Sequence, residues 1–116
     1  MSNSGMIDLD HLEKYVAGDA GLRDEILSIF AEQVEALVAK LSSAQTDEGW
    51  RNAAHALKGA ARGVGAWALG DLAEEAEAAI GPMPGKAERR AGFLLVFRKQ
   101  ANAALEEVKR LRALAA

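Results

Sequence analysis

Apolar residues recur along this chain at intervals of three and four, the spacing that gathers side chains on one face of an α-helix. One such series contains Ile26, Phe30 and Val34, and another contains Leu94 and Phe97. Each series stops at residues that cap or interrupt helices, such as serine, glycine or proline. The pattern predicts five helices, over about 8–16, 19–42, 47–63, 66–80 and 86–114, with a loop at 81–85.

Three short polar residues mark where the first three helices begin. Asp8, Asp19 and Thr46 each precede a periodic stretch, and their side chains can accept hydrogen bonds from the unpaired amides of a first helical turn. Ile7 and Leu12 flank Asp8 at the spacing of a hydrophobic staple. We therefore expect these residues to be helix N-caps.

The composition favours a fold built from helices alone. Alanine, leucine, glutamate, lysine and arginine are abundant, whereas threonine occurs once and proline twice. Long helices with short connections favour antiparallel neighbours. We expect an all-α fold, namely an antiparallel up-and-down four-helix bundle with a short N-terminal capping helix. It would form a single domain over 1–116, with 1–6 as a flexible tail.

Charge and residue usage argue against several functional classes. The chain has 14 cationic and 17 anionic residues, a net charge of -3, whereas nucleic-acid binders are usually basic. Without cysteine it has no disulfide, thiolate zinc site or thiol chemistry. No apolar run approaches the roughly 20 residues of a membrane span, and no signal-peptide pattern precedes the first helix. We expect a cytoplasmic protein that binds neither nucleic acid nor membrane.

One face of the third predicted helix combines a histidine, a glycine and three cationic residues: Arg51, His55, Lys58, Gly59 and Arg62. Their spacings of three, four and seven place them together, away from the apolar face. Neighbouring cations would lower the pKa of the imidazole and attract an anion. Because a neutral imidazole is a nucleophile, this face is suited to accept a phosphoryl group on a ring nitrogen.

Gly59 strengthens this interpretation. A glycine inside a helix costs about 1 kcal/mol relative to alanine, a residue that this chain uses freely. Its lack of a side chain would let a partner or a phosphate approach His55 closely. Two other interpretations stay open, namely a solvated basic face with an incidental histidine, and a glycine required by helix packing or a kink.

The segment 55–66, HALKGAARGVGA, closely resembles the H-x-L-K-G…G-A signature of histidine-containing phosphotransfer (HPt) domains. The resemblance extends to nearly the whole chain. Further matching positions are the Gly18–Asp19 turn, Phe30, the aliphatic residues Leu69 and Leu72, and the acidic residue Glu77.

The resemblance implies a stand-alone phosphorelay protein, a four-helix bundle that carries phosphate on Nε2 of His55. By the same analogy, Lys58 would help to hold the phosphoryl oxygens and Gly59 would clear space for a partner. Arg51 and Arg62 complete the expected partner-binding face.

The sequence departs from the family pattern at two places. The family often has a serine just after the glycine, where this chain has Ala60 and Ala61, so any hydroxyl contact to the site is absent. Arg62 is bulkier than the small residue often found there, which bears on partner choice.

The sequence has no Gly-rich phosphate loop, no Walker-type motif and no evident carboxylate cluster for Mg²⁺ beside His55. We therefore expect no autokinase activity, no metal site and no cofactor of its own. The phosphoryl group would come from a receiver-domain aspartate, in a hybrid sensor histidine kinase or a response regulator, and pass to another receiver. The partner would supply Mg²⁺, and the carrier would act as a monomer.

Two other functional classes compete with this hypothesis. A helical docking module would keep the bundle but would not need His55, and an enzyme or metal site would have to recruit His11, the second histidine. A polar residue such as Gln33 is a candidate for orienting the His55 ring. We expect the other conspicuous residues to pack or to lie in solvent: Trp50 and Trp67 as packing residues, Glu74, Glu75 and Glu77 as an acidic helix face, Arg89 and Arg90 as surface residues.

Overall fold

The computed structural model describes residues 6–114, which form five helices and no strand. These are α1 (Leu9–Val16), α2 (Ala20–Ser43), α3 (Asp47–Gly63), α4 (Trp67–Glu77) and α5 (Lys86–Leu114). The all-α prediction is confirmed, and four of the five helices match their predicted ranges closely.

The predicted fourth helix was too long at its C-terminal end. α4 (Trp67–Glu77) stops before 80, because the amides of Ala78 and Ala79 bond to carbonyls three residues back and tighten the chain out of the α-helix. Of the predicted tail, residues 1–5 lie outside the described part of the chain, and Met6 is partly buried against the core.

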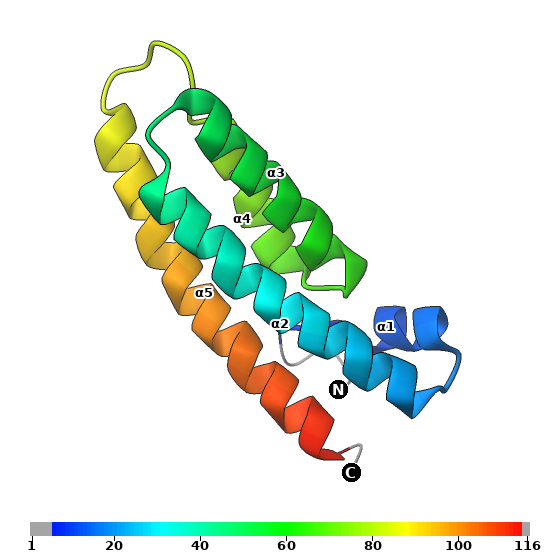
Figure 1. Ribbon diagram of the computed structural model, residues 1–116. Coiled ribbons are helices and arrows are strands. Elements are labelled where there is room, and N and C mark those ends of the chain that lie inside the picture. The colour runs from blue at the N-terminus through cyan, green and yellow to red at the C-terminus, as the bar shows by residue number, and fades with distance from the viewer. Residues whose placement is uncertain (1–5, 115–116) are drawn as a thin grey trace.

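The four longer helices form an antiparallel bundle, as expected. α2 packs against α3 and α5, and α4 also packs against α3 and α5, so the helices follow one another around the core (Figure 1). α2 has 24 residues and α5 has 29, whereas α3 has 17 and α4 has 11. The α3–α4 hairpin is therefore shorter than the pair on which it lies.

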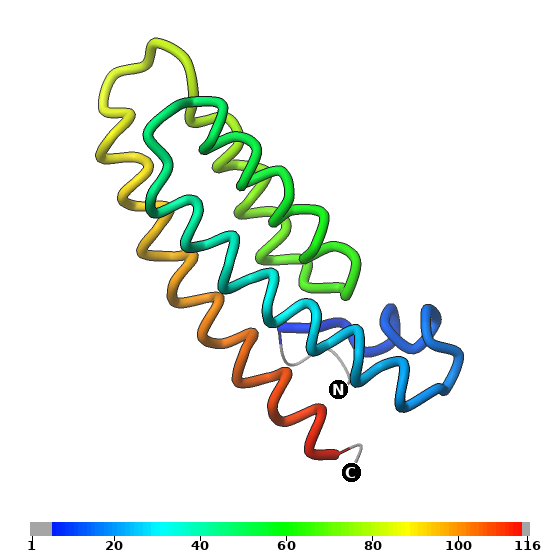
Figure 2. Tube along the Cα trace, viewed as in Figure 1, coloured from blue at the N-terminus to red at the C-terminus, as the bar shows by residue number. Residues whose placement is uncertain are grey.

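α1 occupies the space beyond the α3–α4 turn, alongside the first part of α2 (Figure 2). The Asp8 amide donates to the Gly65 carbonyl at 2.9 Å, which ties the start of α1 to that turn. Gly65 has a φ of 80°, and a Cβ there would stand 2.9 Å from the Asp8 Cβ. Leu12 and Val16 of α1 are buried in the core. The short first helix thus caps one end of the bundle, as predicted.

The core combines bulky residues of α2 and α5 with alanines of α3 and α4. Phe30 and Phe97 are buried, and so are Ala54, Ala61 and Ala73 opposite them in the bundle. The predicted stripe of α2 is confirmed at Phe30 and Val34 and is wider than predicted at its start. Leu27 is fully buried and Ile26 only half-buried, because α2 packs between α3 and α5 and its apolar face spans both contacts.

The three predicted N-caps are confirmed by hydrogen bonds. The capping bonds run from the His11 amide to Asp8 at 3.2 Å, from the Leu22 amide to Asp19 at 3.0 Å and from the Gly49 amide to Thr46 at 3.0 Å.

None of the described helices is both long enough and apolar enough to cross a membrane.

Candidate functional site

His55 lies in the middle of α3 with its side chain 70% exposed. Ala54 and Leu57, on the opposite face of the same helix, are fully buried. The helical period that places those two residues in the core therefore holds the imidazole in solvent. An exposed ring on a rigid helix is accessible to a partner molecule.

Glu77, the last residue of α4, contacts two residues of this face. Its Oε2 lies 3.3 Å from the His55 Nδ1, and its Oε1 lies 2.7 Å from the Lys58 Nζ. The side chains of Lys58 and Glu77 are only 20% and 21% exposed, so the pair is partly shielded from water. The expectation that Glu77 belongs to a solvated acidic face is wrong, and only its position in the family resemblance signalled a role at the site.

The charge on Glu77 fixes how the ring is presented. The Lys58 ammonium lowers the pKa of the Glu77 carboxyl despite partial burial, and the contact with His55 acts in the same direction. Glu77 is therefore ionised at neutral pH, and a carboxylate can only accept hydrogen bonds. The Nδ1 of His55 must carry the proton of this contact, so in the neutral ring Nε2 holds the free lone pair.

The cations expected around His55 are mostly engaged in ion pairs. Lys58 pairs with Glu77, while the Arg62 guanidinium lies 3.3 Å from Asp71 and 3.2 Å from Glu74 on α4. Those carboxylates raise the pKa of Arg62 against the opposing effect of desolvation. Of the three cationic residues that the sequence places on the His55 face, Lys58 and Arg62 are thus paired with carboxylates of α4.

Arg51 and Arg62 differ in how they are held. Arg62 extends across Gly70, where an added Cβ would lie 2.9 Å from the Arg62 Cγ. Arg51, one turn before His55, is exposed and forms no ion pair within residues 6–114. Arg51 is thus available to bind an external anion, whereas Arg62 is already paired with carboxylates of α4.

Beside the histidine, α1, α2 and α3 enclose an apolar groove of about 290 Å³. Gly59 forms part of its wall, and a Cβ at that position would meet nothing within 4 Å. Packing among residues 6–114 therefore does not require this glycine, which removes helix packing as an explanation for it. The groove, as the term is used below, is lined by Leu12, Tyr15, Ile26, Ile29, Phe30, Gln33, Gly59, Ala60, Gly63 and Val64.

Comparison with known families agrees with this geometry. The family model described as Hpt domain matches residues 25–114, which is most of the chain. The chain belongs to the Hpt domain family. Hpt domains act in histidine phosphotransfer within phosphorelays, as carriers that interact with receiver domains rather than as typical enzymes. No curated protein and no solved structure matches the chain.

In this Hpt domain the two histidines lie at opposite ends of α4. His11 packs edge-on against Trp67 with ring centroids 4.8 Å apart, whereas His55 contacts Glu77. Glu77 follows Trp67 by ten positions, which correspond to about 15 Å of helix. The structure therefore does not bring the two imidazoles together. No group of three or more potential metal ligands occurs within residues 6–114.

Two further residues considered from the sequence, Gln33 and Ala60, lie in the wall of the groove. Gln33 lines the groove of this Hpt domain, and the contact to the His55 ring comes from Glu77 instead. Ala60, which replaces the usual serine, also lines the groove, whereas Ala61 is fully buried in the core. The absence of a hydroxyl at position 60 thus makes the groove wall more apolar.

Proposed function

We propose that this Hpt domain accepts a phosphoryl group on the Nε2 of His55 from the aspartyl phosphate of a receiver domain, and later transfers it to an aspartate of another receiver. The observation that carries the proposal is the exposed ring of His55, with Nδ1 against the Glu77 carboxylate at 3.3 Å. This arrangement supports Nε2 as the nucleophile because the proton is held on the other nitrogen.

The transfer itself needs little chemistry from the carrier. The Nε2 lone pair attacks phosphorus, an N–P bond forms, and the P–O bond to the aspartate breaks, leaving a carboxylate on the donor. The ring keeps its Nδ1 proton and becomes cationic, and the adjacent Glu77 carboxylate balances that charge. Return transfer to a second aspartate reverses each bond change.

The charge that builds on the phosphoryl oxygens requires cations close to the ring. Phosphoryl transfer proceeds through a loose transition state in which three equatorial oxygens share negative charge. Lys58 is oriented by its 2.7 Å contact with Glu77, and Arg51, which forms no ion pair among the described residues, lies one turn from His55. We assign phosphate stabilisation to Lys58 and contact with the partner to Arg51, with Arg62 as a more distant contributor.

The groove offers the partner a place to dock that is continuous with the phosphoacceptor. Gly59 is one turn from His55 and leaves its wall open, while Tyr15 and Ile29 expose 68% and 48% of their surface at its rim. We assign the groove to an apolar helix of the receiver domain. The receiver would contribute Mg²⁺ and its own acidic pocket, and this chain would have neither autokinase activity nor a cofactor.

The test is phosphoryl transfer from a labelled, pre-phosphorylated receiver domain to the full chain. We expect a label that is lost in acid, is stable in alkali and is absent from the His55→Gln variant. Because the chain has only two histidines, His11→Gln is the matched control and should be labelled like the wild type.

Label on His55→Gln would contradict the assignment of the phosphoacceptor. Failure of the folded wild type to accept label from any of several receivers would contradict the carrier function. In that case a docking module that binds receivers without phosphotransfer becomes the better interpretation.

A further inference from the structure

The carboxylate that contacts His55 belongs to an intrinsically weak end of a helix. Glu77 is the last residue of α4, where the final carbonyl groups have no partner within the helix. α4 has no basic residue in its last turn and carries Glu74, Glu75 and Glu77 there. Negative charges are unfavourable at a helix C-terminus because they face the negative end of its dipole. This end therefore depends on support from other elements.

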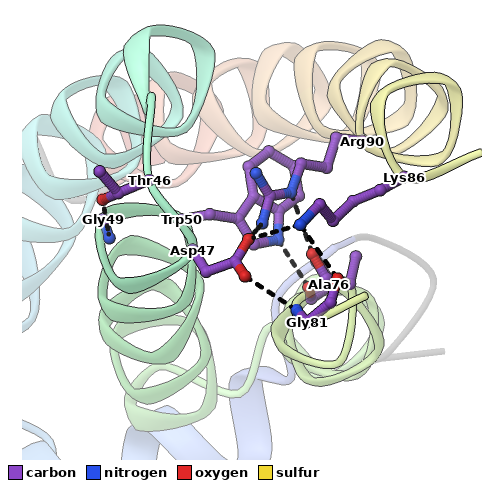
Figure 3. Close-up of polar contacts among 9 residues, drawn as sticks. Thr46, Asp47, Gly49, Trp50, Ala76, Gly81, Lys86 and Arg90 are labelled. Atoms are coloured by element: carbon purple, nitrogen blue, oxygen red, sulfur yellow. Dashed lines mark hydrogen bonds and ion pairs between the residues drawn. The ribbon is translucent and has the colours of Figure 1, made fainter. Parts of the chain in front are cut away.

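Two side chains bind the backbone on either side of Glu77. The indole Nε1 of Trp50, on α3, donates to the Ala76 carbonyl at 2.7 Å, and the Nε of Arg90, on α5, donates to the Ala79 carbonyl at 3.0 Å. Figure 3 shows side chains from α3 and α5 converging on the end of α4. Glu77 is thus bracketed by anchors from two different helices.

The Asp47 carboxylate binds Arg90 and two further groups beside the end of α4. Oδ1 of Asp47 accepts from the Arg90 Nη2 at 2.6 Å and from the Lys86 Nζ at 3.0 Å, and its Oδ2 accepts from the Gly81 amide at 2.9 Å. We call Asp47, Trp50, Lys86 and Arg90 the α4 anchor.

Arg90 is the central member of the α4 anchor. Its guanidinium carbon lies 5.0 Å from the centroid of the Trp50 ring, so one side chain contacts Trp50, Asp47 and the Ala79 carbonyl. The side chain is only 16% exposed. The expectation that Arg90 is a surface residue is wrong, because its partners lie on helices that the sequence pattern does not bring together.

We propose that Arg90 is a positioning residue for the phosphoacceptor: by fixing the last turn of α4, it holds the Glu77 carboxylate against Nδ1 of His55. This inference rests on the proposed function of His55. The contact at 3.3 Å is near the upper limit of a hydrogen bond, so a displacement of a few tenths of an ångström removes it. Lys58 alone does not fix the carboxylate, because its ammonium is carried on a flexible four-carbon stem.

The test compares Arg90→Met with Arg89→Met in the full chain. Arg89 is adjacent and exposed, and its side chain forms no ion pair within the described residues, so it is a matched control. Nitrogen-15 NMR of the His55 ring distinguishes the Nδ1–H from the Nε2–H form. The Glu77→Ala variant gives the reference spectrum of a ring that lacks the carboxylate contact.

We expect the Nδ1–H form to predominate in the wild type and in Arg89→Met, and Arg90→Met to shift towards the Glu77→Ala spectrum. Phosphoryl acceptance by Arg90→Met should be roughly tenfold slower, since small displacements at a reacting group have large kinetic effects. A merely structural role for Arg90 would lower stability without changing the ring form of the folded protein.

A folded Arg90→Met with the wild-type ring form would overturn the inference, whatever its transfer rate. If Arg90→Met does not fold, Arg90→Lys decides by the same readout. Lysine keeps the charge but lacks the planar fork that reaches Asp47 and the Ala79 carbonyl together, so an intermediate spectrum is expected and an unchanged one overturns the inference. Absence of transfer in the wild type would contradict the proposed function alone, because the ring form is measured without phosphate.

Discussion

At the scale of single residues, Glu77 and Gly59 give the two sides of His55 different properties. On the α4 side, a carboxylate contacts both the imidazole and the Lys58 ammonium, which makes that side polar and ordered. On the α2 side, Gly59 leaves an open apolar wall. The imidazole is therefore oriented from the α4 side by Glu77 and is accessible to a partner from the α2 side.

Replacement of Gly59 by alanine should stabilise the fold and impair transfer. The added methyl group meets nothing within 4 Å, so the helix propensity of alanine should raise the free energy of unfolding by about 1 kcal/mol. The same methyl group narrows the approach to His55, so transfer from a receiver should be slower. Urea denaturation and the labelled transfer assay measure the two effects.

Gly92→Ala is the control for this prediction. Gly92 lies within α5, and a Cβ there also meets nothing within 4 Å. It should gain similar stability and transfer normally. A Gly59→Ala protein that transfers as fast as Gly92→Ala would show that access at position 59 is unimportant.

At the scale of elements, the end of α4 is held by α3 and α5 more than by its own sequence. Asp47 belongs to the first turn of α3, yet it binds the Gly81 amide beyond α4 and two cations of α5. The Gly81 amide, and next the Lys86 ammonium and the Arg90 guanidinium, lower the pKa of the Asp47 carboxyl to about 2. The ionised form of Asp47 is thus the form that joins the three helices.

Asp47→Asn should lower thermal stability at neutral pH, and the difference from the wild type should disappear in acid. A carboxyl whose pKa is lower in the folded than in the unfolded state stabilises the fold above its unfolded value of 3.8, and this contribution is lost as the pH falls towards 2. Circular dichroism melting curves from pH 7 to pH 2 measure the difference. A difference that stays constant over this range would exclude the ionised carboxylate as its cause.

At the scale of the whole molecule, the unequal helix lengths explain why α1 is part of the fold. The molecule measures 48 × 23 × 20 Å, and the 29 residues of α5 alone account for about 44 Å of the long axis. The α3–α4 hairpin covers only part of this length. α1 fills the remaining space next to α2, with Leu12 fully buried and Tyr15 exposed over the groove.

Substitutions at these two residues of α1 should therefore affect different properties, one the stability of the fold and the other the binding of a receiver. Leu12→Ala should lower the free energy of unfolding by about 2–5 kcal/mol, since it leaves a cavity in the shared core. Tyr15→Ala should leave stability nearly unchanged and weaken binding of the receiver. Urea unfolding and a titration with a receiver domain measure the two effects, and a separate early transition of α1 in Leu12→Ala would contradict its place in one cooperative core.

Features encoded by nearby residues could be predicted from the sequence, and features made by distant ones could not. The caps at Asp8, Asp19 and Thr46 involve amides three residues away, so a local pattern was sufficient. The contact of Glu77 with His55 spans 22 residues, and that of Arg90 with its partner Asp47 spans 43. Such pairs depend on how helices pack, which the spacing of apolar residues does not specify.

The crossing of Arg62 over Gly70 has a consequence for how related sequences can vary. A Cβ at position 70 would lie 2.9 Å from the Arg62 Cγ, so a larger residue at 70 requires the Arg62 side chain to move or to be replaced by a smaller one. A smaller residue at position 62 would relieve the collision but would deprive Asp71 and Glu74 of their counter-ion. An exchange of Gly70 on α4 is thus coupled to position 62 on α3, and diversification at position 70 should favour compensating pairs over single exchanges.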